Sequence, residues 1–139
     1  MTPKNVAELR ALISTLDHQD SKVFSLPETA DPTKAMDILR QAVQAHDVSQ
    51  VRTHRDEGLV ESWYHGRTKY KQKDIVIMAA VDTEQKKAQV TVHCDLSEMT
   101  TGLLAEIGRE FGDELEKQLG ARVVHISIKD SVVYKSSLF

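Results

Sequence analysis

One segment constrains the fold more than any other, because residues 96–119 place an apolar side chain at every fourth position. These side chains are Met99, Leu103, Ile107, Phe111, Leu115 and Leu119. Residues three and four apart share one face of an α-helix, so the spacing predicts a long amphipathic helix from Leu96 to Leu119. Gly120 follows directly and supplies a stop signal.

Three extended runs precede this helix, at 59–66, 75–81 and 88–94, and a polar turn at 82–87 joins the last two. The middle run, I-V-I-M-A-A-V, is apolar at every position, which predicts a strand covered on both faces. The third run alternates, with Val90, Val92 and Cys94 on one face and Gln89, Thr91 and His93 on the other. Three antiparallel strands in a meander are the simplest arrangement.

Two amphipathic helices are expected near the N-terminus. The first covers 4–16, where Asn5 and Glu8 are spaced as a capping box. The second covers 32–46, where Asp31-Pro32 is a start signal. Residues 22–26 have weak strand character. Residues 47–57 show no clear period and are interpreted as a loop or a frayed helix end.

Two more strands are expected after the long helix, at 122–129 and 132–135. The expected element order is therefore α-α-β-β-β-α-β-β in one α+β domain spanning 1–139. A helical N-terminal part (1–57) precedes a strand-rich part (58–139), and the helices pack on one face of a mainly antiparallel sheet of about five strands. The length of 139 residues suits one core.

Charge and hydropathy exclude several broad classes. The formal charge of −3 gives the whole chain no attraction to phosphate backbones or anionic lipid. No apolar stretch is long enough for a secretory signal or a membrane span, so a cytoplasmic location without membrane contact is expected. The single cysteine fits a reducing compartment. Phosphate-binding glycine loops are absent, and no cofactor is predicted.

The stretch H-C-D at residues 93–95 combines residue types that bind metals and run nucleophilic catalysis. Strand alternation, however, turns Cys94 toward the core and His93 the opposite way. Asp95 and Glu98 are spaced as a capping pair for the long helix. The three side chains are therefore expected to diverge, and neither a metal site nor a catalytic residue is predicted.

A polar sheet face offers one candidate site. If strands 88–94 and 122–128 are neighbours, their outward side chains bring together Thr91, His93, His125 and Ser127. Such a surface suits an anion, a small molecule or a hydrolytic reaction, and its histidines titrate near neutrality. The alternative is the wet face of a one-sided sheet, which folding alone requires.

The segment S-W-Y-H-G-R-T-K-Y-K-Q-K, residues 62–73, is the second candidate site. Basic residues alternate with aromatic ones, as in proteins that bind single-stranded nucleic acid or other polyanions. The residues concerned are Trp63, Tyr64, Arg67, Lys69, Tyr70, Lys71 and Lys73. The alternative is a solvated hairpin whose lysines prevent aggregation.

Small residues along the long helix form the third candidate site. Thr101, Ala105, Gly108 and Gly112 make a flat stripe, although each helical glycine costs about 0.8–1 kcal/mol relative to alanine. Something must offset that cost. Either a neighbouring backbone of the same chain approaches closely, or the stripe is an interface between two copies.

The order of elements resembles that of small acidic secretion chaperones: a helical start, a three-strand meander, a long helix and two more strands. The resemblance implies a dimer that binds unfolded segments of other proteins. Together with the lack of a catalytic motif, it favours a non-catalytic homodimeric interaction protein with an unidentified protein partner. Nucleic-acid binding through 62–73 is the first alternative, and a site near His93 and His125 is the second.

Overall fold

The computed structural model describes residues 2–69, 71–120 and 124–126. Its elements are α1 (Val6–Ser14), β1 (His18–Ser25), α2 (Pro32–Gln44), β2 (Val48–Asp56), β3 (Leu59–Arg67), β4 (Asp74–Asp82), β5 (Lys87–Cys94), α3 (Ser97–Leu119) and β6 (Val124–Ile126). The strands form one antiparallel sheet in the order β2-β3-β4-β5-β1-β6. The chain is a small α+β domain, as predicted. None of the helices described is both long and apolar enough to cross a membrane.

The predicted element order is wrong at two places, because residues 18–25 and 48–56 are strands. The start of β1 is polar and exposed, yet the strand pairs with β5 over its whole length. β2 is the edge of the described sheet, and all its side chains are exposed or half-buried. A bulge between Gln50 and Arg52 interrupts its alternation. Backbone pairing, rather than an apolar pattern, makes both segments strands.

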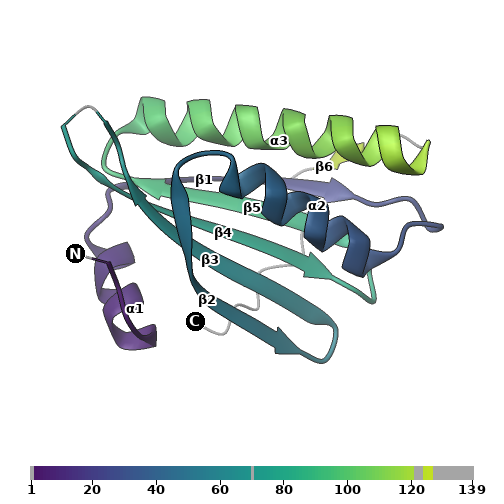
Figure 1. The fold of residues 1–139 in the computed structure, drawn as a ribbon, viewed down its shortest axis with the longest axis horizontal. Helices are drawn as coiled ribbons and strands as arrows, with labels where there is room; N and C mark the ends of the chain where they lie inside the picture. Colours follow the sequence, from purple (N-terminus) through teal and green to yellow (C-terminus); the bar gives the residue numbers. More distant parts are fainter. Residues whose placement is uncertain (1, 70, 121–123, 127–139) are drawn as a thin grey trace.

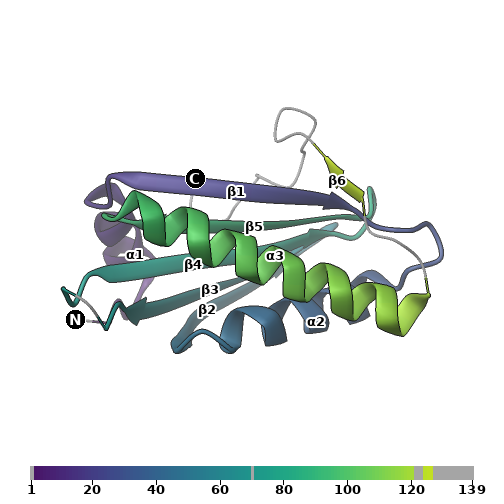
Figure 2. The same cartoon turned by 90° about the horizontal axis from the view of Figure 1, so that it is seen from above.

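The helices occupy both faces of the sheet, which corrects the expectation of a single helical layer. α2 and α3 cover one face, and α1 lies on the other (Figures 1 and 2). The main core lies under α2 and α3 and includes Tyr64, Ile77 and Phe111. The smaller core joins Leu9 of α1 to Trp63, Val76, Met78 and Ala80.

This two-sided cover explains the continuous apolar run of β4. Ile75, Ile77, Ala79 and Val81 contribute to the main core, and the residues between them contribute to the smaller one. Successive side chains of a strand point to opposite faces, so a strand with a layer on each side needs apolar residues throughout. The prediction that this strand is covered on both faces is confirmed.

The helix ends follow the predicted signals in most places. Asp31 accepts a hydrogen bond from the Thr33 backbone N–H (2.9 Å), and Asn5 accepts one from the Glu8 N–H (2.9 Å). Gly120 ends α3 in the left-handed conformation, with φ +67°. The exception is the start of α3, where Leu96 is the N-cap residue and no side chain forms a cap hydrogen bond.

Candidate functional site

An open groove of about 470 Å³ lies at one end of the molecule. The end of α2, the start of α3 and the turn between β3 and β4 meet there, and Figure 2 shows these segments at the same end of the sheet. Ala45–Asp47, 67–69 and 96–103 supply most of the lining, together with Ile75 from β4. Ligand sites commonly have volumes of about 300–1,000 Å³, so the groove is large enough to bind another molecule.

The apolar lining comes mainly from α3. Leu96, Met99 and Leu103 are each half-buried, and Ile75 behind them is buried. Met99 and Leu103 belong to the stripe that further along α3 includes the fully buried Ile107 and Phe111. The sheet and α2 therefore bury the middle of the stripe but not its first part, which remains in contact with solvent.

Charged side chains form the rim of the groove. Arg67 Nε lies 3.4 Å from Asp74 Oδ1, and the same oxygen is 2.8 Å from His65 Nε2. Lys69 Nζ lies 3.9 Å from Asp47 Oδ2, and both of these side chains are largely exposed. Such an exposed ion pair contributes about 0–1 kcal/mol, so it opens readily.

His46 closes the groove on the α2 side. Its Nδ1 lies 3.6 Å from Glu106 Oε2 and its Nε2 lies 3.4 Å from Glu110 Oε2. Both carboxylates belong to α3, one helical turn apart, so His46 connects the end of α2 to the middle of α3. The imidazole therefore lies between the end of α2 and α3, at the edge of the groove.

The basic segment 62–73 does not form the surface that its sequence suggests. Trp63 and Tyr64 are 1% and 0% exposed and belong to different cores, so neither ring is available for stacking on a base. The strand ends at Arg67, and Lys71 has a positive φ, so the basic residues surround a turn instead of sharing one strand face. Both faces of β3 are covered by other elements, which is why its two aromatic side chains are buried. Tyr70 lies outside the described residues.

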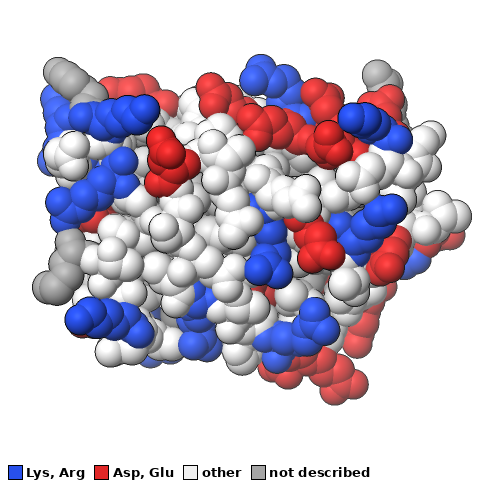
Figure 3. Space-filling view, in the orientation of Figure 1, with Lys and Arg blue, Asp and Glu red and all other residues white. Residues whose placement is uncertain are grey.

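The basic side chains are nevertheless close together in space. Figure 3 shows Lys and Arg side chains gathered at the end of the molecule where β3 turns into β4. Arg67, Lys69, Lys71 and Lys73 belong to this turn, which we call the basic turn. Arg67 and Lys69 of the basic turn also line the groove.

The side chains of His93, Cys94 and Asp95 diverge, as predicted. Cys94 is buried in the main core, and His93 lies on the opposite face, stacked on Trp63 with ring centroids 6.3 Å apart. Burial lowers the pKa of His93 to about 4. Asp95 is not the predicted cap of the long helix, because its carboxylate accepts a hydrogen bond from the Asp17 backbone N–H (3.1 Å).

The two strands on which the predicted site at His93 and His125 depends are not adjacent. β1 lies between β5 and β6, so the two strands are not neighbours, and His125 pairs with Phe24 of β1. Thr91 and His93 are 7% and 4% exposed, so their face is not the wet surface expected. Thr91 is instead hydrogen-bonded to Ser21 of β1, with 2.7 Å between the hydroxyl oxygens. Ser127 lies outside the described residues.

The small-residue stripe of α3 divides into two parts. A Cβ added to Gly108 meets Lys22 Cδ at 3.0 Å and Phe24 Cζ at 3.4 Å, so this glycine allows β1 of the same chain to approach closely. Thr101 and Ala105 are exposed, and a Cβ added at Gly112 meets no described atom within 4 Å. Internal packing thus accounts for Gly108, whereas the interface prediction stays open for the other three.

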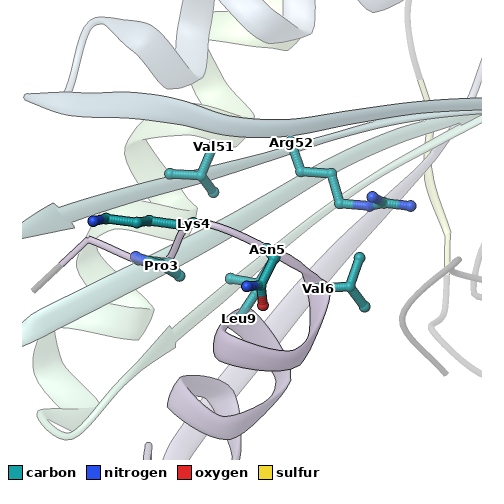
Figure 4. A pocket seen from close by; sticks show the side chains of 7 residues that line it. All are labelled: Pro3, Lys4, Asn5, Val6, Leu9, Val51 and Arg52. Atoms are coloured by element: carbon teal, nitrogen blue, oxygen red, sulfur yellow. The ribbon is translucent and has the colours of Figure 1, made fainter.

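A second hollow, of about 80 Å³, lies between the start of α1 and β2 (Figure 4). Pro3, Lys4 and Asn5 line it on one side, and Val51 and Arg52 line it on the other. Its volume holds a few water molecules, at about 30 Å³ each, and is too small for most ligands. Among the described residues, no cluster of His, Cys, Asp and Glu side chains has the arrangement of a metal site.

No protein-family model matches this chain, and comparison with curated proteins finds no similar sequence. The assignment of a function therefore depends on the groove itself. Sequence reasoning missed it, although Met99 and Leu103 are recognisable as members of the apolar stripe. The spacing of a stripe does not tell which of its residues a neighbouring element leaves uncovered.

Proposed function

We propose that the chain is a non-catalytic interaction protein, comparable to an adaptor or chaperone, that binds a segment of a partner protein in the groove. One observation carries the proposal: Leu96, Met99 and Leu103 are only half-buried, and they line an open groove. Apolar side chains left open to solvent within a hollow are typical of protein-binding surfaces.

The chemistry of the lining favours binding over catalysis. Met99 has a flexible, polarisable side chain that adapts to different apolar partners. The thiol of Cys94 lies in the main core, where it cannot reach a substrate in the groove. Charged side chains such as Arg67 and Lys69 line the same groove, and protein interfaces commonly combine apolar and polar contacts in this way.

The proposal is tested by selecting short random peptides displayed on phage against the full chain. The tightest binder is then labelled with fluorescein and measured by anisotropy. Replacing Met99 and Leu103 together by glutamine should weaken its binding on the order of tenfold or more, because truncating a central apolar contact costs about 1–2 kcal/mol. Circular dichroism establishes that the variant is folded, and Met99→Gln alone serves if it is not.

Gly102→Gln is the matched control, because it adds the same side chain to the exposed side of α3. Its binding should equal that of the wild type. Failure to enrich any peptide, or equal affinity in the lining variant and the wild type, would refute peptide binding in the groove. A small hydrophobic ligand that binds there in place of peptides would reassign the groove to a small-molecule site.

The proposal includes a homodimer in the cytoplasm. The exposed residues Thr101 and Ala105, together with the half-buried Gly112, support self-association through α3, and the buried free thiol of Cys94 is compatible with a reducing compartment.

Light scattering should give the mass of two chains for the wild type and of one chain for Ala105→Arg, since an exposed arginine keeps the helices apart. Arg109→Ala, which shortens an exposed α3 side chain, should remain a dimer. A monomeric wild type would remove dimerisation from the proposal and leave the groove unaffected.

A further inference from the structure

We infer that the partner segment is acidic: it places a large apolar side chain in the groove and a carboxylate against the basic turn. This inference rests on the proposed function and names the chemistry of the partner. Its basis is that one groove is lined both by the apolar side chains of Met99 and Leu103 and by Arg67 and Lys69 of the basic turn.

Arg67 has donors to offer a bound carboxylate. Its ion pair with Asp74 involves Nε, at 3.4 Å, and the guanidinium carries two further nitrogen atoms. Asp74 has a second partner besides Arg67, since His65 Nε2 lies 2.8 Å from the same carboxylate oxygen. The side chain of Arg67 is 45% exposed, so a ligand in the groove can reach it. A planar guanidinium matches a carboxylate with two parallel hydrogen bonds.

Lys69 is available on similar grounds. It is 94% exposed, and its partner Asp47 lies at 3.9 Å and is 83% exposed. Breaking the ion pair between Lys69 and Asp47, so that Lys69 can bind a carboxylate of the partner, therefore costs little free energy. Lys71 and Lys73 stand in the same turn and add positive charge next to Arg67 and Lys69.

The start of α3 adds a further attraction for negative charge. This helix of 23 residues begins at the groove, where Leu96, Glu98 and Met99 line the wall. No side-chain cap satisfies its first backbone N–H groups. A helix N-terminus carries a partial positive charge, which stabilises a nearby carboxylate. An acidic segment thus meets favourable groups from α3 as well as from the basic turn.

Charge complementarity also argues against a basic partner. Glu98 and Asp47 are the acidic residues that line the groove. Glu98 already lies in the first turn of α3, and Asp47 is already close to Lys69. A lysine in the partner that paired with Asp47 would have to displace Lys69 and would face the basic turn. A carboxylate in the partner instead meets the opposite charges of Arg67 and Lys69.

The inference is tested with the peptide selected on the full chain and with a second version in which each Asp and Glu is replaced by its amide. The selected sequences should be rich in acidic residues next to apolar ones. The acidic peptide should bind the wild type on the order of tenfold more tightly than its amide version, a preference that falls as salt is raised. Arg67→Glu/Lys69→Glu should remove this preference.

The control Lys34→Glu/Lys117→Glu changes the net charge equally at exposed sites on α2 and α3 and should keep the preference. Lys69→Glu alone replaces the double variant if that protein is unfolded. Equal binding of the acidic and amide peptides, or selection of neutral or basic sequences, would overturn the inference.

The two proposals fail in different ways. Binding that depends on Met99 and Leu103 but not on peptide charge overturns the acidic partner and leaves the groove as a protein-binding site. Binding that is insensitive to the lining refutes the proposed function. A fluorescent single-stranded oligothymidylate serves as a second probe. If it binds more tightly than the acidic peptide and loses affinity in Arg67→Glu/Lys69→Glu, the basic turn recognises nucleic acid and the inference is wrong.

Discussion

Replacing Phe111 by alanine should lower the free energy of unfolding by about 3–5 kcal/mol, the largest effect expected of any single substitution here. Phe111 is fully buried at the centre of α3, and its ring packs edge-on against Phe24 of β1, with centroids 5.2 Å apart. The substitution removes this aromatic contact and leaves a cavity between the helix and the sheet. Urea unfolding followed by circular dichroism measures the change.

Two variants frame this result. Phe111→Leu keeps most of the volume and should cost less than half as much, which keeps the comparison measurable if the alanine variant does not fold. Glu116→Ala, on the exposed side of the same helix, should change stability by less than about 0.5 kcal/mol. Equal losses for the alanine and leucine variants would mean that Phe111 does not fill the core as described.

The second large effect is a loss of stability in mild acid caused by His93. Burial lowers its pKa to about 4 in the folded protein, whereas an unfolded chain gives a histidine about 6.5. The unfolded chain therefore takes up the proton first as the pH falls. The contribution of His93 to stability is complete above about pH 6.5 and is lost progressively down to about pH 4.

Each pH unit in that interval costs about 1.4 kcal/mol, so the total loss from a folded-state pKa of about 4 is roughly 3 kcal/mol. Urea unfolding at a series of pH values from neutral to pH 4 measures it. Other groups titrate in the same range, so the comparison is made with His93→Gln, which keeps a polar side chain without this titration. If the variant loses as much stability as the wild type, His93 is not buried in its neutral form.

The parts of the fold that could be predicted are those where one strong pattern determines the local structure. The four-residue spacing of α3 and the unbroken apolar run of β4 both belong to this group. β2 and the polar first half of β1 were missed because their backbone pairing, and not their side chains, makes them strands, whereas residues 22–26 had shown weak strand character. The position of α1 was missed for a different reason: an amphipathic helix shows which of its faces is buried but not which face of the sheet it covers.

The candidate site was harder to predict than the fold. The basic residues of segment 62–73 were recognisable from the composition. Trp63 and Tyr64 were assigned to the same binding surface, but their side chains lie in two cores. The groove combines residues from 45–47, 67–69 and 96–103, which become neighbours only through the strand order and the helix positions. No local pattern contains that information, so the sequence predicted a basic surface and not the apolar groove beside it.

The position of Trp63 has a practical consequence for spectroscopy. It is the single tryptophan of the chain, and it lies in the smaller core beneath α1, stacked on His93. Intrinsic fluorescence of this protein therefore reports on the docking of α1 and not on the layer formed by α2 and α3. Far-ultraviolet circular dichroism is dominated by the long helix α3 on the opposite face. A pair of optical signals thus follows the two sides of one sheet separately, and their coincidence during unfolding is a direct measure of how tightly β4 couples them.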